Sequence, residues 1–120
     1  MSQPRKVLQA VFFVSDTGRR PVRDWLMEQS QQDRKTIGED IATLEFCWPI
    51  GKPKCAAMQG VKGLYEVRSS ISSGRIARVL FLLIGNQMVL LHGFVKKTQK
   101  TPDKDLKLAI ARMKEVQRHG

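Results

Sequence analysis

Cationic side chains gather in one stretch of the sequence, residues 63–102, and they are the residues best suited to chemistry on an anion. Glu66 is the only acidic residue from position 63 to 101. Guanidinium groups bind phosphate through two parallel hydrogen bonds, and ammonium groups add point charges. We therefore expect an anionic partner for this stretch, which holds the following cations: Arg68, Arg75, Arg78, Lys96, Lys97 and Lys100.

Arg78 is the most informative of these positions. Residues 75–84 are apolar on both faces, a pattern typical of a central strand covered on two sides. An arginine in such a strand costs free energy unless it is paired or faces a wet groove. One interpretation is an internal ion pair with Glu66 on the neighbouring strand. The other is an anion site in which Arg68, across a hairpin, converges with Arg78 on one phosphate.

The lysine cluster follows the strand predicted at residues 87–95. A lysine run of this kind is either a solvated surface or a set of charges that positions a nucleic-acid backbone. Hydroxyl and amide groups within the run can bond phosphate or base edges, and loop lysines at 52 and 54 could extend the basic surface. The RNA-binding candidates are Lys96, Lys100, Thr98, Gln99, Arg75 and Tyr65, with Lys97 placed among the catalytic candidates beside Arg78 and Arg68.

Two further side chains have alternative roles. His92 shares a strand face with Phe94 and Lys96, and it is either a structural residue or a catalytic one. Tyr65 either stacks on a base or fills the core. The sequence contains no Gly-rich phosphate loop, no paired carboxylates near Glu66 and no metal-ligand spacing, so we expect no cofactor, no metal and no metal-dependent nuclease. No histidine–carboxylate pair is evident, which leaves Lys96, Lys97 or His92 as the proton acceptor.

The surrounding pattern predicts an α+β fold in the order β-α-α-β-β-β-α. We expect a strand at 6–14, a helix at 21–29, and a second helix capped by Ser30 and ended by Pro49. A loop at 50–61 leads to strands at 64–70, 75–84 and 87–95, and a last helix starts at Thr101 and Pro102. Short hairpins after residues 70 and 84 predict a small antiparallel sheet. The length fits one domain, residues 1–120.

Composition limits the partners. The formal net charge is +10 and the pI is about 10.1, which suits nucleic acid, an anionic membrane or an acidic protein, although a basic chain can also bind none of them. Cys47 and Cys55 lack a metal-ligand spacing and indicate free thiols rather than a bridge. No signal peptide is evident and the longest apolar run, 79–84, is too short to span a membrane. We expect a cytoplasmic protein without membrane contact.

Three motifs together resemble the RelE/ParE toxin superfamily, in its HigB-like branch. They are GLYEVR with RIARVLF in the strands, LLHGFVKKTQKTP at the last strand, and G-x-x-PV-x-DWL near the amino terminus. The resemblance implies a phage-derived toxin of a type II toxin–antitoxin system with a RelE/ParE-like fold. Its expected partners are a cognate antitoxin, encoded by the adjacent gene, and mRNA on the ribosome.

The resemblance also implies residue roles. Arg78 matches the strand arginine that contacts the scissile phosphate in RelE-type nucleases. Arg68 matches a basic residue on the preceding strand of those nucleases, and Lys97 matches a second position that stabilises the phosphate. Glu66 stands where RelE has a lysine. The implied activity is a metal-independent endoribonuclease, an mRNA interferase that uses 2′-OH attack. Two alternatives remain: a ParE-like toxin that binds DNA gyrase, and a non-toxic, phage-derived nucleic-acid-binding module.

Overall fold

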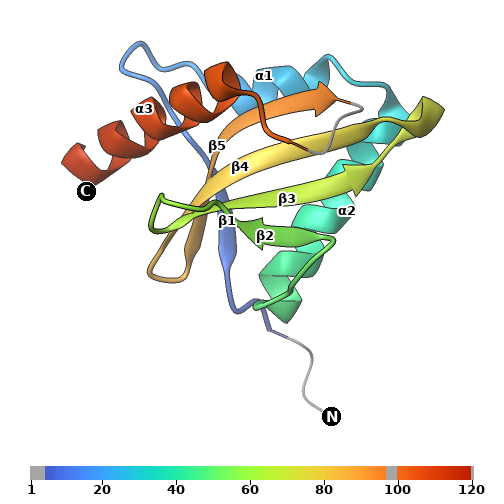
Figure 1. Ribbon diagram of the computed structural model, residues 1–120, viewed down its shortest axis with the longest axis horizontal. Coiled ribbons are helices and arrows are strands. Elements are labelled where there is room, and N and C mark those ends of the chain that lie inside the picture. The colour runs from blue at the N-terminus through green and yellow to red at the C-terminus, as the bar shows by residue number, and fades with distance from the viewer. Residues whose placement is uncertain (1–4, 97–99, 120) are drawn as a thin grey trace.

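A five-stranded sheet with helices on both faces forms the body of the protein (Figure 1). The computed structural model describes residues 5–96, without the side chain of residue 96, and residues 100–119. The elements are β1 (Gln9–Phe12), α1 (Pro21–Met27), α2 (Gln31–Cys47), β2 (Cys55–Ala57), β3 (Leu64–Ser70), the short 3₁₀ turn η1 (Ser72–Gly74), β4 (Ile76–Ile84), β5 (Gln87–Lys96) and α3 (Asp103–His119). The predicted α+β class is confirmed.

The strand order is β1-β5-β4-β3-β2. The hairpins predicted after residues 70 and 84 are present, and they make β3, β4 and β5 antiparallel. β1, however, pairs with β5 in parallel, so the sheet is mixed. The hairpin signals fix the direction of the last three strands only, and they carry no information on β1.

β2 lies inside the segment predicted to be a loop. It has only three residues and pairs antiparallel with β3, Cys55 opposite Val67 and Ala57 opposite Tyr65. Three residues are too few to produce a visible alternation of apolar and polar positions. This short strand is one edge of the sheet, and the second half of β3 extends beyond it.

Each face of the sheet has its own core. α1 and α2 pack against one face, and α3 crosses the other face, where it is drawn orange to red in front of the sheet (Figure 1). β4 supplies Val79 and Phe81 to the first core and Leu80 and Leu82 to the second. This double coverage explains why β4 is apolar on both sides.

An irregularity in the β4–β5 pairing decides which residues face α3. Leu80 lies opposite His92 while Phe81 lies opposite Leu90, so Leu91 is an extra residue on β5. Such a bulge changes the side to which the following residues point. His92 consequently faces α3, and Gly93 faces Trp25 of α1.

The amino end of α2 is fastened to the β3–β4 connection. The Ser30 hydroxyl accepts a hydrogen bond from the Asp33 N–H, as predicted for the cap. The Asp33 carboxylate is buried and accepts bonds from the backbone N–H and the hydroxyl of Ser72, and from Arg75. The contact orients η1 and the start of β4 against the helix.

The structure also bears on the state of the cysteines and on membrane-spanning helices. Cys47 and Cys55 are both free, the former exposed and the latter buried. Within residues 5–96 and 100–119, no helix is both long enough and apolar enough to cross a membrane.

Candidate active site

Two arginines lie directly opposite each other on neighbouring strands. Arg68 of β3 pairs in register with Arg78 of β4, on the face that α3 covers. Like charges at directly opposed positions destabilise a sheet. Glu66 is two residues before Arg68 and therefore points to the same face, where its carboxylate can offset this repulsion.

Glu66 holds both guanidinium groups through one oxygen. Its Oε1 accepts from Arg68 Nε at 2.5 Å and from Arg78 Nη1 at 3.0 Å. Its Oε2 accepts from the Thr101 hydroxyl at 2.7 Å. The carboxylate thus connects β3, β4 and the segment that leads into α3.

Burial differs sharply between the two arginines. The side chains of Arg78 and Glu66 are each 1% exposed, whereas that of Arg68 is 30% exposed. Three formal charges of +1, +1 and −1 leave a net positive charge in a poorly solvated place. The ion pair of Arg78 with Glu66, one of the two interpretations of the sequence, is thus present.

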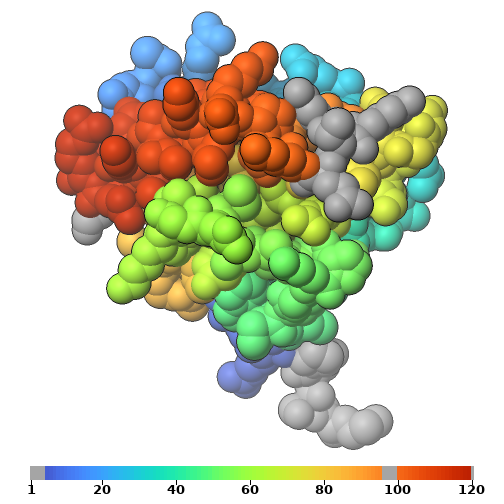
Figure 2. Space-filling view, in the orientation of Figure 1, coloured from blue at the N-terminus to red at the C-terminus, as the bar shows by residue number. Residues whose placement is uncertain are grey.

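The arginine pair lies between two adjoining pockets. Lys52, Arg68 and Arg78 line both of them. The larger pocket, about 610 Å³, reaches from the open end of β3 to α2. The smaller one, about 330 Å³, extends past Glu66 to Lys100, Thr101 and the first turn of α3. In Figure 2 this second region lies between the green segment 52–59 and the orange start of α3.

The site is thus a groove that contains one buried and one partly exposed arginine, and lysines and carboxylates line the rest of it. Its lining comes from α2, from the loop and strands between residues 52 and 78, and from the start of α3. Such a groove can bind a phosphodiester and stabilise extra negative charge on it. Among the described residues, no group of three or more His, Cys, Asp or Glu side chains is arranged to hold a metal ion.

Comparison with known proteins identifies the family of the chain. Residues 24–114, more than half of the chain, match the family described as "Phage derived protein Gp49-like (DUF891)". The chain belongs to the Gp49-like family. This family is part of the RelE/HigB-like toxin group. No curated protein matches the sequence.

Of the remaining residues that the sequence predicted for the site of this Gp49-like protein, only some lie in the described part of the chain. Lys100 is exposed and lines the smaller pocket with the arginine pair. Lys97, Thr98 and Gln99 lie outside the described residues, as does the side chain of Lys96. Their proposed roles stay predictions.

Arg75 and Tyr65 lie away from the groove. Arg75 Nη2 donates to Asp33 at 3.0 Å and to the Ser72 hydroxyl, which ties it to the amino end of α2. Tyr65 points to the opposite face of the sheet, where it stacks on Phe81 and meets Trp48 edge to face. Tyr65 therefore occupies the core position that was one of its two predicted roles.

His92 has a carboxylate partner that the sequence did not reveal, which corrects the expectation that no such pair is present. His92 Nε2 lies 2.7 Å from Asp105 Oδ1 of α3, and Arg112 Nη1 lies 3.5 Å from His92 Nδ1. Arg112 also donates to the carbonyl of Leu91, and burial lowers the pKa of its guanidinium. His92 belongs to neither described pocket beside the arginine pair.

Asp105 and Thr101 are the contributors that sequence reasoning missed. Both lie at the start of the last helix, which the sequence located through Thr101 and Pro102 without indicating a role for either residue in the site. A signal for Asp105 was present, because Asp105, Ala109 and Met113 are spaced four apart and form the buried stripe of α3. An acidic residue on such a stripe implies a buried partner.

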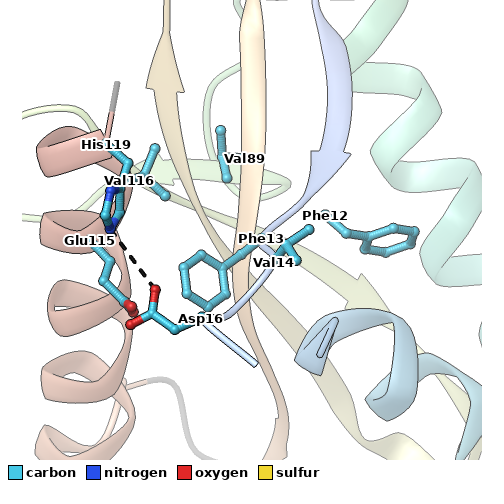
Figure 3. A pocket seen from close by; sticks show the side chains of 8 residues that line it. All are labelled: Phe12, Phe13, Val14, Asp16, Val89, Glu115, Val116 and His119. Carbon is cyan, nitrogen blue, oxygen red and sulfur yellow. Dashed lines mark ion pairs between the residues drawn. The ribbon is translucent and has the colours of Figure 1, made fainter. Parts of the chain in front are cut away.

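A third pocket, about 310 Å³, is of a different kind (Figure 3). It lies between the end of β1 and the last turns of α3, and Phe13 and Val116 are among its apolar residues. Its polar residues are Asp16, Glu115 and His119, and an exposed ion pair joins Asp16 to His119 at 3.9 Å. None of the described residues that line it is lysine or arginine, so it does not resemble a phosphate site.

Proposed function

We propose that this Gp49-like protein is the toxin of a type II toxin–antitoxin system and cleaves mRNA on the ribosome. The observation that carries the proposal is the opposed pair Arg68 and Arg78, held by Glu66 at the floor of a cationic groove. Membership of a RelE/HigB-like toxin family supports it. The HigB-like branch is the one that the HGFVKKTQKTP motif favours.

The chemistry we propose is attack of a ribose 2′-OH on the adjacent phosphate, without a metal. Arg78 and Arg68 neutralise the extra charge of the phosphorane, which is where preorganised donors contribute most. Arg68 is the first of the two that RNA reaches, because its side chain is partly exposed. Lys97 is a further candidate for this charge stabilisation.

Other residues position the RNA and move the proton. Lys100 and Lys52, which both line the smaller pocket, attract the RNA backbone near the scissile phosphate. The proton acceptor is Lys96, Lys97 or His92, and the carboxylate of Asp105 would orient the ring of His92. The reaction ends with a 2′,3′-cyclic phosphate on the upstream fragment and a 5′-OH on the downstream one.

The cognate antitoxin completes the system. A groove that carries a net positive charge in its floor is readily blocked by an acidic segment. We therefore expect the antitoxin, the product of the adjacent gene, to bind the toxin and to prevent access of mRNA to Arg68.

Expression in cells tests the proposal. Induction of the parent should arrest growth and produce new 5′ ends in translated mRNA, mapped by primer extension, and co-expression of the adjacent gene should reverse both. Arg68→Ala and Arg78→Lys should each reduce cleavage by about 100-fold, the order of effect seen when one charge-stabilising donor is lost. Arg23→Ala, which removes an exposed arginine of α1, is the matched control.

The outcomes separate the alternatives. Intact mRNA together with a DNA-damage response would instead identify a gyrase-binding toxin. Absence of growth arrest would favour the passive nucleic-acid-binding module. If Arg78→Lys and Arg68→Ala both remained as toxic as the parent, the assignment of the site would be wrong.

A further inference from the structure

The larger pocket beside the arginine pair has features that phosphate binding does not use. Its volume of about 610 Å³ is in the range of sites for small organic ligands, roughly 300–1,000 Å³. Its walls combine apolar Pro53 and Ile76 with the hydroxyl groups of Thr36 and Ser70. A carboxylate, Asp40, lies among them. This mixture suits a flat, partly polar ring better than it suits a phosphate.

We propose that this pocket binds the nucleoside next to the scissile phosphate and prefers a base that carries an exocyclic amino group. The inference deepens the proposed function and rests on it for the position of the phosphate. Arg68 and Arg78 line both pockets, so a nucleotide whose phosphate contacts them extends its base into one of the two. The larger pocket has the room and the apolar surface for a base.

Asp40 supplies the preference. It is held on α2, its side chain is 16% exposed, and its Oδ1 accepts from Lys54 Nζ at 2.5 Å. Within the described part of the chain, no hydrogen bond is made to Oδ2. An ionised carboxylate can only accept, so it pairs with an amino group such as N4 of cytosine or N6 of adenine.

Uracil is the base that this carboxylate disfavours. Where cytosine carries its amino group, uracil presents the carbonyl oxygen O4, which repels a carboxylate. The N3–H of uracil is its one donor on this edge, and it is flanked by O2 and O4, so a carboxylate that approaches it meets two acceptor oxygens in a partly desolvated place. The pocket therefore discriminates cytosine and adenine from uracil. Asp40 could alternatively serve only to hold Lys54, and the two roles predict different behaviour of two variants.

The test compares short single-stranded oligonucleotides that the protein cannot cleave. Hexamers of 2′-O-methylcytidine and of 2′-O-methyluridine carry the same charge and lack the free 2′-OH. In fluorescence anisotropy at fixed salt, the parent should bind the cytidine hexamer roughly tenfold more tightly, the order expected for one hydrogen bond to a charged group. Asp40→Asn should bring the ratio close to one, because an amide both donates and accepts.

Two further variants make the result specific. Lys54→Ala breaks the same ion pair but keeps the carboxylate, so it should weaken binding of both hexamers and preserve the ratio. Asp24→Asn removes one negative charge from the exposed face of α1 and should leave the ratio unchanged. Urea midpoints of all variants show whether each is folded.

The proposed subsite is overturned if the parent binds the cytidine and uridine hexamers equally well, or if the Asp40→Asn variant keeps the preference for cytidine. Loss of the ratio in Lys54→Ala also overturns it, since the ion pair and not the carboxylate would then be responsible. Cleavage on the ribosome without any cytosine preference in the hexamers refutes the subsite and leaves the proposed nuclease intact. A tenfold ratio without mRNA cleavage supports the subsite and refutes the nuclease.

Discussion

At the scale of single residues, Glu66 is the group on which the site depends most. Its carboxylate accepts hydrogen bonds from two arginines and a threonine while the residue is almost fully buried. Without it, Arg68 and Arg78 would lie opposite each other and lack the carboxylate that offsets their like charges. A structural role, compensation of two like charges, therefore explains the presence of Glu66 independently of catalysis.

Glu66→Gln tests this role. The variant keeps the shape of the side chain but removes the charge that offsets two guanidinium groups, so we expect the free energy of unfolding to fall by about 3–5 kcal/mol. Urea denaturation at pH 7 measures the loss. Glu28→Gln, at an exposed position after α1, is the matched control and should change stability by less than about 0.5 kcal/mol. Equal stability of the two variants would contradict the role of Glu66.

Burial also affects the thiol of Cys55, which is a neighbour of Glu66. Cys55 of β2 lies close to Glu66, and burial, with a smaller contribution from Glu66 and an opposing one from Arg68, raises the pKa of its thiol to about 11. Thiolate is the reactive form of cysteine. Cys55 is consequently a packing residue, and the exposed Cys47 is the thiol open to modification.

At the scale of elements, Asp33 joins α2 to the connection between β3 and β4. The backbone N–H of Ser72 is the largest cause of a lowered Asp33 pKa, and the hydroxyls of Ser72 and Ser30 and the charge of Arg75 act in the same direction, while burial opposes them. A carboxyl whose pKa is lower in the folded protein stabilises the fold at a pH above its unfolded value. That contribution is lost as the pH falls through the folded pKa.

Asp33→Asn should therefore destabilise the protein in a pH-dependent way. The deficit in unfolding free energy relative to the parent should be largest at neutral pH. It should shrink as the pH falls below 3.8, the ordinary value for Asp, toward the lowered pKa of Asp33. Urea midpoints measured from pH 7 down to about 2.5 give the profile. Asp24→Asn, on the exposed side of α1, should produce no comparable profile, and a constant deficit in Asp33→Asn would refute the explanation.

Gly93 determines how α1 packs against β5. A Cβ at this position would lie 2.4 Å from Cε3 of Trp25 and also too close to two neighbouring ring atoms. The glycine of the HGFVKK motif is thus explained by packing, with no role in chemistry required.

Gly93→Ala should lower the free energy of unfolding by about 1–3 kcal/mol, because the Trp25 ring has to move away from the sheet. Gly38→Ala is a control for which we expect the free energy of unfolding to rise. Gly38 is exposed within α2 with no neighbour within 4 Å of an added Cβ, so alanine should stabilise the helix by about 0.5–1 kcal/mol. Thermal unfolding of the two variants measures the direction of each change in stability. A Gly93→Ala protein as stable as the parent would show that the Trp25 contact is looser than described.

At the scale of the whole molecule, the sequence was sufficient for the fold class and for the arginine pair. Periodicity located the long strands and helices, and two hairpin turns fixed which strands lie side by side. Arg78 stood out because it interrupted an apolar strand, and an ion pair with Glu66 was one of the two interpretations of that position. These inferences needed only local spacing.

What the sequence could not provide depends on contacts between distant segments. The parallel pairing of β1 and the three-residue β2 have no local signal. The His92–Asp105 pair and the Thr101–Glu66 bond form because α3 returns across the sheet. The meeting of Lys52 and Asp40 at one pocket requires the loop before β2 to lie beside α2.

The central claim is that the arginine pair of this groove promotes metal-independent cleavage of mRNA on the ribosome. The most direct measurement is to add the purified protein to ribosomes translating a defined mRNA and to determine the chemical ends of the fragments. We expect a 2′,3′-cyclic phosphate upstream and a 5′-OH downstream, with cleavage reduced by about 100-fold in Arg68→Ala and unchanged in Arg23→Ala. Intact mRNA, 5′-phosphate ends, or full cleavage by Arg68→Ala would contradict the claim.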